Sequence, residues 1–532
     1  MATHLVNLDA LIPRDDFESV TDSPLVSLSL AAGLKVNELE SHGLTYLTLR
    51  KPDFQRETAS WDPEKVVDLV ESFLDGDLIP ALILWRSPTS GNIFVIDGAH
   101  RLSALIAWVH DDYGASSKSL DFFENLVTPE QVEAATKCRA LIESRIGSYK
   151  KLTLALQKPE NSTAEQVRRA RNMAVLQVQL QWVSGDAKKA EASFFKINQK
   201  ATAINATELA MLKSRRKPNA IATRAIIRAG VGHKYWSGFP EEVQQSIQRL
   251  AREIYDNLFT PVLETPIKTL DLPVAGRGYS AESVKLVFDF VNLANSLSLR
   301  GKQEDDLEDD LSGDETVRFL KSVKRLSNLI SGAHPGSLGL HPAVYFYSLG
   351  GRYQPSAFLA TAKLLDDFDR TNAFPRFTDV RKKFEDFLVK HRYLVNHVAG
   401  KFGSGPRSME PILGMYRTII SCLYGNADEE EIFKRFREDP KTITLAPYTE
   451  EEQRAGRNFR SETKSAIYLK EAIDNAPRCQ ICGARIHKKA VTIDHIKRKA
   501  DGGLGTFENG QLAHPYCNTG YKEHNVSGSI AR

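Results

Sequence analysis

Two pairs of metal-binding side chains lie close together near the end of the sequence. Cys479 and Cys482 form the first pair, His514 and Cys517 form the second, and two residues separate the members of each pair. Each pair can sit on a tight knuckle, and three thiolates with one imidazole make a closed tetrahedral zinc site. A free redox CxxC is the alternative, but such motifs usually open a helix in a thioredoxin-like unit. The spacing therefore predicts a structural Zn²⁺ that compensates for the small core of a short module.

Between the two pairs, the segment AVTIDHI (490–496) predicts a strand that ends in Asp494 and His495. Hydrolysis of a phosphodiester needs a divalent ion to stabilise the developing charge and a base that activates water. Asp494 offers a hard oxygen ligand for Mg²⁺, as does the side-chain carbonyl of Asn518. His495 is expected on the opposite face of the strand, where it could deprotonate the water. Asn509 could orient His495.

Basic residues follow this segment. Lys497, Arg498 and Lys499 come directly after it, and Lys522 stands four residues after Asn518. Residues 451–532 hold 14 Lys and Arg against 9 Asp and Glu, whereas the rest of the chain holds 56 against 58. A compact basic segment on a neutral chain indicates a local polyanion site. We therefore expect these four cations to contact a phosphate backbone.

In the order CxxC, DH, GG, N, CN and K, these landmarks resemble the HNH (ββα-metal) nucleases over about 50 residues. The resemblance implies His495 as general base, Asp494 and Asn518 as ligands of Mg²⁺ or Mn²⁺, and Asn509 as the structural or orienting asparagine. The departure is His514, where cysteine is commoner, and histidine is a competent zinc ligand. A degenerate finger that only binds DNA is the alternative, which the intact DH and both asparagines disfavour.

A second group of polar residues stands at the predicted strand-to-helix turn VIDGAHRL (95–102). Gly98 lets the backbone approach a ligand, and the helix start presents free amides to an anion. His100 and Arg101 add donors that suit phosphate, and Asp97 could hold Mg²⁺ or accept a proton. From these residues alone, an Asp–Arg ion pair that closes the turn is equally compatible.

The order PDFQRETASW (52–61), IPALIL (79–84) and VIDGAHRL resembles the ParB/sulfiredoxin-like DGQHR-type domains, and among them the GmrSD/SspE-like family. FFKINQKATAINATEL (194–209) matches a later signature of that family, with Asn198 at its polar centre. The resemblance implies a nucleotide or phosphate pocket lined by Gln55, Arg56, Asp97, Gly98, His100 and Arg101. Ala99 replaces the usual glutamine of DGQ, so the contact of that glutamine is absent or replaced. A scaffold that only positions the nuclease is the alternative.

Local patterns predict the elements that carry these residues. The segment 45–50 (TYLTLR) alternates as a half-buried strand does. Asp62, followed by proline, predicts a helix start. Apolar runs at 78–85 and 92–97 predict two strands, and a helix follows the second run. These elements together predict an α/β unit.

The rest of the chain is mostly helical in pattern. The acidic run EDDLEDDLSGDE (304–315) predicts a solvated loop. The segment 380–391 predicts a helix whose apolar stripe belongs to a core, and SAIYLKEAIDNAPR (465–478) predicts a helix directly before the cysteines.

With 532 residues, 42% of them hydrophobic and 26% charged, the chain can form several cores. We predict a multidomain fold of the α/β plus α class. Its parts are an N-terminal extension (1–40), a ParB-like sensor or NTPase domain (41–220), a helical middle region (221–450) and an HNH module (451–532). The short apolar runs and the opening MATHLVNLDALIPRDD predict no membrane span and no secretory signal, hence a cytoplasmic protein.

These features predict a metal-dependent DNA endonuclease of bacterial anti-phage defence, gated by the N-terminal domain through a nucleotide or a DNA modification. The expected cofactors are structural Zn²⁺, catalytic Mg²⁺ or Mn²⁺, and an NTP. The expected partners are DNA, as modified phage DNA or the host's own, and a nucleotide, and homo-oligomers stay open. Two alternatives remain: a ParB-like nucleotide switch whose zinc module only binds DNA, and an HNH nuclease that acts on RNA, although aromatic stacking motifs typical of RNA binding are not evident.

Overall fold

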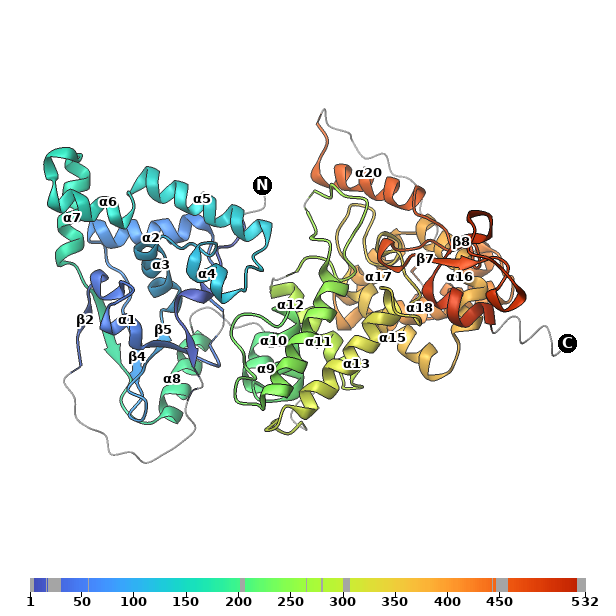
Figure 1. The fold of residues 1–532 in the computed structure, drawn as a ribbon, viewed down its shortest axis with the longest axis horizontal. Helices are drawn as coiled ribbons and strands as arrows, with labels where there is room; N and C mark the ends of the chain where they lie inside the picture. Colours follow the sequence, from blue (N-terminus) through green and yellow to red (C-terminus); the bar gives the residue numbers. More distant parts are fainter. Residues whose placement is uncertain are drawn as a thin grey trace. The chain divides into compact units, whose positions relative to one another are not determined.

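The computed structural model divides the chain into two compact units (Figure 1). The first comprises residues 1–215 and 231–235, and the second comprises residues 216–230 and 236–532. The residues that the structure describes are 4–15, 17, 30–55, 57–200, 206–264, 266–278, 281–299, 307–442, 444–445 and 458–523.

A six-stranded mixed sheet forms the centre of the first unit. Its strand order is β1-β3-β5-β4-β6-β2. β5 pairs with β3 in parallel and with β4 in antiparallel orientation, and β4 pairs with β6 in parallel. The strands are β1 (Arg14–Asp15), β2 (Gly33–Leu34), β3 (Leu49–Pro52), β4 (Leu82–Arg86), β5 (Ile93–Asp97) and β6 (Val178–Trp182).

Helices cover both faces of this sheet. Leu82, Leu84 and Val95 point into the core shared with α2 and α3, whereas Trp85 and Phe94 point into a smaller core with α8. This alternation along β4 and β5 is what a sheet buried on both faces requires. The helices of the unit are α1 (Leu44–Thr48), α2 (Pro63–Asp75), α3 (Ala99–His110), α4 (Ser117–Phe122), α5 (Pro129–Arg145), α6 (Tyr149–Gln157), α7 (Ala164–Val175), α8 (Ala187–Lys200) and α9 (Ala206–Lys213).

Most of the local predictions for this unit are confirmed, and one is wrong. Asp62 caps α2 by accepting a hydrogen bond from the Lys65 amide at 2.9 Å, and both apolar runs contain the predicted strands. The segment 45–50, however, begins as helix α1, and β3 starts only at Leu49. The Thr48 hydroxyl donates to helical carbonyls three and four residues back, and the Tyr46 hydroxyl donates to the Leu11 carbonyl. A tertiary contact of Tyr46 thus accompanies a helical turn where alternation predicts a strand.

The second unit begins as a helical assembly. α11 packs on α13, and α18 packs between α15 and α16. Within the acidic run, Asp310 is buried and accepts hydrogen bonds from the backbone of Gly313 and Thr316, so it caps α13. The helices are α10 (Pro218–Ile227), α11 (Glu241–Phe259), α12 (Ala281–Ala294), α13 (Asp314–Ile330), α14 (Pro342–Tyr345), α15 (Pro355–Arg370), α16 (Phe374–Lys390), α17 (Tyr393–Phe402), α18 (Pro406–Tyr424), α19 (Glu429–Glu438) and α20 (Ser461–Asp474).

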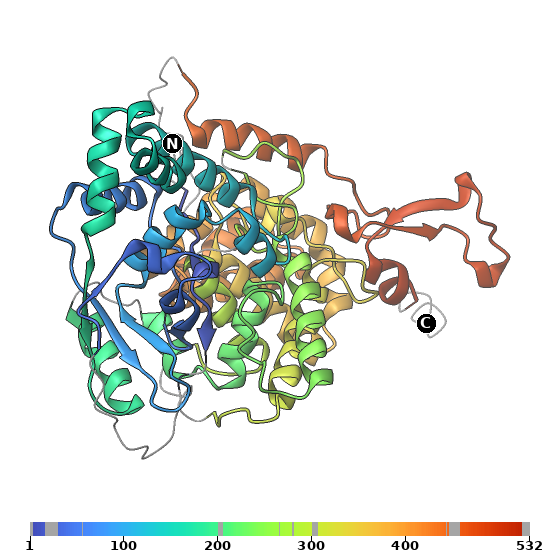
Figure 2. The same ribbon diagram turned by 60° about the vertical axis from the view of Figure 1, so that its left-hand side comes forward.

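A small ββα arrangement follows α20 and belongs to the same unit. Strands β7 (Thr492–His495) and β8 (Gly510–Ala513) form an antiparallel pair, and the helical turn η8 (Cys517–Tyr521) follows β8. In Figure 2 this hairpin, in red, extends away from the helical body of the unit. The predicted strand at 490–496 and the predicted helices at 380–391 and 465–478 are all present, and the stripe of the first helix is buried. The fold is therefore a helix-rich mixture of α and β.

Candidate functional site

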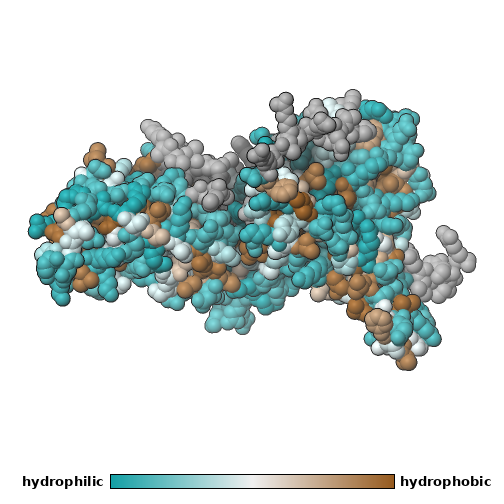
Figure 3. Space-filling view, turned by 90° about the horizontal axis from the view of Figure 1, so that it is seen from above, coloured by the Kyte–Doolittle hydropathy of each residue, from teal (hydrophilic) through white to brown (hydrophobic). Residues whose placement is uncertain are grey.

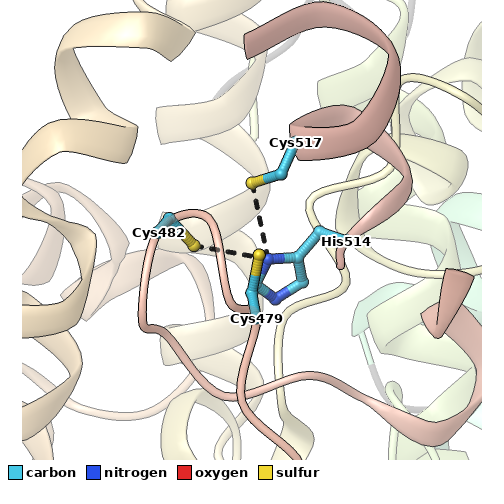
Figure 4. A group of neighbouring side chains, drawn as sticks. All are labelled: Cys479, Cys482, His514 and Cys517. Carbon is cyan, nitrogen blue, oxygen red and sulfur yellow. Dashed lines mark hydrogen bonds between the residues drawn. The ribbon is translucent and has the colours of Figure 1, made fainter. Parts of the chain in front are cut away.

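The four predicted zinc ligands meet at one point (Figure 4). Their ligand atoms all lie within 4.8 Å of one another, and the side chains of Cys479, Cys517 and His514 are buried. Nδ1 of His514 faces the thiols, at 3.5 Å from Sγ of Cys482 and 3.6 Å from Sγ of Cys517. Zinc–sulfur bonds of about 2.3 Å place tetrahedral ligands about 3.8 Å apart. These four side chains could therefore hold one metal ion such as zinc.

Hydrogen bonds within the cluster share its protons unevenly, since they lower the pKa of the Cys479 thiol and raise those of Cys482 and Cys517. Nε2 of His514 donates to the Arg485 carbonyl at 3.0 Å, which leaves Nδ1 free of a proton and turned toward the thiols. Burial lowers the pKa of His514, so its imidazole is neutral at neutral pH. Hydrogen bonds from Cys482 and then Cys517 hold the pKa of the Cys479 thiol well below its usual range. A neutral imidazole and a thiolate are the forms that ligate metal.

Asp494 is buried on β7, beside the helical turn. Nζ of Lys522 lies 2.8 Å from Oδ2 of Asp494, and Nε2 of Gln511 donates to the same oxygen at 2.7 Å. Gln511 stands directly opposite Asp494 in the strand pair. Lys522, predicted to contact the DNA backbone, thus pairs with Asp494 and also donates to the His495 carbonyl.

His495 and Asn518 both follow Asp494 in the sequence, His495 directly and Asn518 on the helical turn η8. His495 follows Asp494 on β7, so its side chain projects from the opposite face, where it is half exposed. Asn518 lies on η8, and its side-chain nitrogen reaches the Ile493 carbonyl at 3.4 Å and the Thr492 hydroxyl at 3.5 Å. The amide of Asn518 therefore lies along the strand that carries Asp494.

Asn509 fixes the loop that follows His495. Its side-chain oxygen accepts from the Lys497 amide at 2.7 Å, and its nitrogen donates to the carbonyls of Lys497 and Leu504. A Cβ at Gly503 would lie 1.9 Å from the Lys497 carbonyl oxygen, so only glycine fits there. Asn509 thus organises the loop backbone, whereas no hydrogen bond joins it to the His495 ring among the described residues.

The three predicted backbone cations behave differently. Arg498 pairs with Asp501 at 2.8 Å and with Glu523 at 3.3 Å. Lys497 and Lys499 are exposed, and no ion pair is found for their ammonium groups within the described part of the chain.

The segment from Cys479 to His487, which we call the knuckle, rests on α16 through residues that lie outside the predicted site. Arg381 is completely buried, and its Nε donates to Oε1 of Glu385 at 2.9 Å. Oε2 of Glu385 accepts from the Arg485 amide at 2.8 Å, and Nη1 of Arg485 pairs with Asp386 at 2.9 Å. Arg381 also donates to the Leu338 carbonyl at 2.5 Å. No spacing rule links these groups, because about a hundred residues separate α16 from the knuckle.

His487 makes a second connection to the helices. Its Nδ1 lies 2.5 Å from the Ser331 hydroxyl, and its Nε2 lies 3.2 Å from Oδ1 of Asp271. The order Ser–His–Asp resembles a hydrolase triad, but Ser331 is completely buried and cannot meet a substrate. This trio therefore joins the knuckle to α13 and to the 271 loop as a structural contact.

In the first unit, the predicted phosphate-binding turn is closed by an ion pair. Nη2 of Arg101 lies 2.8 Å from Oδ2 of Asp97 and donates to the Ala81 carbonyl at 3.1 Å. Gly98 has a φ of 94°, and a Cβ there would lie 2.9 Å from the Arg101 guanidinium. Glycine thus lets Arg101 fold back on the turn. The side chains of Asp97 and Arg101 remain about a quarter exposed.

The other predicted residues of this pocket are only partly described. Nε2 of His100 lies 2.7 Å from the Ser60 hydroxyl, and its ring stacks on Trp61. Gln55 is buried. Arg56 lies outside the described residues, as does the side chain of Asn198.

A buried charge cluster elsewhere in the first unit was not predicted. Oδ1 of Asp9 lies 2.7 Å from Nζ of Lys51 and 2.8 Å from Nη2 of Arg14. Burial lowers the pKa of Lys51 to about 8. No motif in the sequence indicates this cluster, because Lys51 stands between Arg50 and Pro52 as a surface lysine also could.

Comparisons with known proteins assign both ends of the chain. Residues 36–214 match the family model of the GmrSD restriction endonuclease N-terminal domain, and residues 479–524 match that of the HNH endonucleases. No match was found among curated proteins or among solved structures. Among the described residues, no helix is long and apolar enough to cross a membrane. The predicted fusion is confirmed, and its two parts support a DNA endonuclease of the restriction type.

Proposed function

We propose that this fusion of a GmrSD-type domain with an HNH endonuclease domain is a metal-dependent DNA endonuclease of anti-phage defence, and that its N-terminal unit controls the cut. The observation that carries the proposal is the arrangement around β7. Asp494 is buried on one face of the strand, Asn518 lies along it, and His495 projects from the other face.

The oxygen donors suit a hard divalent ion. Mg²⁺ is often held by one or two protein oxygens together with water and substrate phosphate. Asp494 and Asn518 would hold the ion, and the ammonium of Lys522 already occupies a cation position on Asp494. Bound Mg²⁺ or Mn²⁺ would stabilise the charge that develops on the phosphate and the leaving oxygen.

The chain itself supplies the base and its orientation. A ring nitrogen of His495 would take the proton of the attacking water as the new P–O bond forms and the bond to the leaving oxygen breaks. The backbone of His495 is fixed on both sides, because it pairs with Gly510 and its carbonyl accepts from Lys522. Zinc at the cysteine–histidine cluster would keep this small hairpin folded.

The N-terminal unit would act as the control element. The Asp97–Arg101 pair stands at the end of β5 where α3 begins, and the helix start offers free amides to an anion. A nucleotide phosphate that entered the turn would replace the Asp97 carboxylate as the partner of the Arg101 guanidinium. The guanidinium is already positioned at the turn, because the absence of a side chain at Gly98 leaves room for it.

Plasmid cleavage with Mg²⁺ or Mn²⁺, with and without NTPs, tests the proposal. We compare the wild type with His495→Ala and with His397→Ala, which removes an exposed histidine outside the HNH segment. Cleavage by the wild type and His397→Ala but not by His495→Ala is expected. A His495→Ala protein that cuts as fast as the wild type contradicts the proposal, and cleavage of total RNA but not of plasmid redirects it to an RNA substrate.

Control by the N-terminal unit has its own comparison. Arg101→Ala is expected to change the dependence of cleavage on the nucleotide or on DNA modification, whereas Arg171→Ala, at an exposed arginine of α7, is not. If Arg101→Ala cuts with an unaltered dependence, the N-terminal unit does not act through this turn.

A further inference from the structure

Large apolar side chains are exposed on the hairpin that carries His495. The exposed fractions are 64% for Ile493, 55% for Ile496, 72% for Leu504 and 94% for Phe507. Single exposed apolar residues are ordinary, but a group of four within fifteen residues forms a surface that indicates binding. We name these four residues the hairpin patch. In Figure 3, brown side chains gather on the projection at the lower right, where this hairpin lies.

Ile493 of the hairpin patch lies on the His495 side of the strand pair, close to the backbone of Phe507. Ile493 and His495 are two residues apart on β7 and so share a face. Gly510 stands opposite His495, and a Cβ at Gly510 would lie 3.5 Å from Cγ2 of Ile493 and 3.6 Å from the Phe507 carbonyl oxygen. Ile493 and the proposed general base therefore share a face, and the backbone of Phe507 lies beside it.

The loop that presents the patch is ordered by its own hydrogen bonds. The Ile496 amide donates to the Asn509 carbonyl at 2.9 Å, and the side chain of Asn509 holds the carbonyl of Leu504 at 2.7 Å. Presenting the apolar side chains on a fixed backbone lowers the entropy lost on binding.

The positive charge of two exposed lysines beside the hairpin patch indicates what kind of partner binds there. Lys497 and Lys499 are exposed beside Ile496, without an ion pair within the described ranges. A second copy that used the same surface would bring these lysines close to their equivalents, which disfavours self-association. A polyanion with apolar stacked faces satisfies both the lysines and the patch, and duplex DNA has this chemistry.

We propose that the hairpin patch is a DNA wedge: Phe507 and Leu504 enter a base step of the duplex while Lys497 and Lys499 contact the flanking phosphates. This inference rests on the proposed function in taking DNA as the substrate. Apolar side chains inserted at a base step unstack it and bend the duplex. The wedge would thereby fix the scissile phosphate beside His495.

Binding of full-length His495→Ala protein to duplexes that carry 2-aminopurine tests the wedge without cleavage. We expect the fluorescence of the base analogue to rise severalfold on binding. Phe507→Ser, in the same background, is expected to weaken binding about tenfold and to abolish the rise, because one stacked base is lost. Leu311→Ser, which changes a leucine of comparable exposure (87%, against 94% for Phe507) before α13, is expected to leave both unchanged.

The lysines give an independent readout. Lys497→Ala with Lys499→Ala is expected to flatten the salt dependence of binding by about two charges while keeping the fluorescence rise, whereas Phe507→Ser keeps the salt dependence. Unchanged zinc content and unfolding midpoint show that each variant is folded.

Two results overturn the wedge. One is a Phe507→Ser protein that binds and unstacks DNA like the wild type. The other is sedimentation showing that Phe507→Ser dissociates a dimer while each protomer binds DNA unchanged. Failure of the proposed function is distinguishable, because a wild-type chain that unstacks DNA but never cuts would keep the wedge and lose the nuclease.

Discussion

Nζ of Lys522 lies 2.8 Å from Oδ2 and 3.1 Å from Oδ1 of Asp494. The ammonium thus spans both oxygens of the carboxylate that is proposed to hold the divalent ion. Because two cations cannot share these oxygens without repulsion, binding of the ion requires Lys522 to withdraw. Lys522 would then be released toward the phosphate backbone, the partner expected for it from the sequence.

Removing this competitor should make the ion easier to bind. Lys522→Ala is expected to lower the Mg²⁺ concentration for half-maximal cleavage severalfold, and to reduce the free energy of unfolding without metal by about 1–3 kcal/mol, since Asp494 loses a buried partner. Cleavage titrations and urea unfolding in EDTA measure the two effects. Lys464→Ala, at an exposed lysine of α20, serves as control. An unchanged Mg²⁺ requirement would argue against competition.

The histidine in the zinc cluster permits a graded test. His514→Cys keeps a metal ligand but loses the hydrogen bond from Nε2 to the Arg485 carbonyl. We expect one zinc per chain and a loss of about 1 kcal/mol in unfolding free energy. Cys517→Ser should lose the zinc and several kcal/mol with it. Metal analysis and urea unfolding provide both values, and zinc loss from His514→Cys would show that the imidazole is indispensable.

The buried pair on α16 should be essential to the second unit. Arg381→Met leaves Glu385 buried without its guanidinium, which costs about 3–5 kcal/mol. The double variant Arg381→Met with Glu385→Met should recover part of this loss. Arg318→Met, which breaks an exposed pair with Glu315, should cost less than about 1 kcal/mol. Equal destabilisation by the two arginine variants in urea unfolding would contradict the buried contact.

The buried side chain of His341 predicts how the free energy of unfolding depends on pH. Burial lowers its pKa to about 3, and its Nδ1 has no hydrogen-bond partner within the described structure. Below pH 6.5 the histidine therefore takes up a proton in the unfolded chain but not in the folded chain. The free energy of unfolding is thus highest above pH 6.5 and decreases as the pH falls toward 3. Between pH 6.5 and 5 the wild type should lose about 2 kcal/mol more than His341→Leu. Parallel unfolding curves for the two proteins would contradict this.

Short-range spacing predicted the placement of the Cys/His cluster and of the strand β7. The pair Cys479 and Cys482 meets the pair His514 and Cys517 at one point, and the DH dipeptide ends a strand. The positions of such motif residues can be predicted from the sequence, because the local turn or strand that carries each residue fixes its position. The same holds for Asp97 and Arg101, four residues apart, for which an ion pair was one of the two interpretations.

Contacts between distant segments could not be predicted. Arg381 and Glu385 look like an ordinary helical pair in the sequence, and only the fold shows that Arg485 caps them from the knuckle. Tyr46 likewise anchors a helical turn through the Leu11 carbonyl. In both cases the partner lies tens of residues away, beyond any local pattern.

The position of the last two zinc ligands sets an order of events during synthesis. His514 and Cys517 leave the ribosome after the whole first unit and after α16, on which the knuckle rests. The cluster can therefore close only on a chain whose N-terminal unit, the proposed control element, is already made. If the N-terminal unit restrains the nuclease as proposed, translation would delay cleavage activity until that unit has been synthesised.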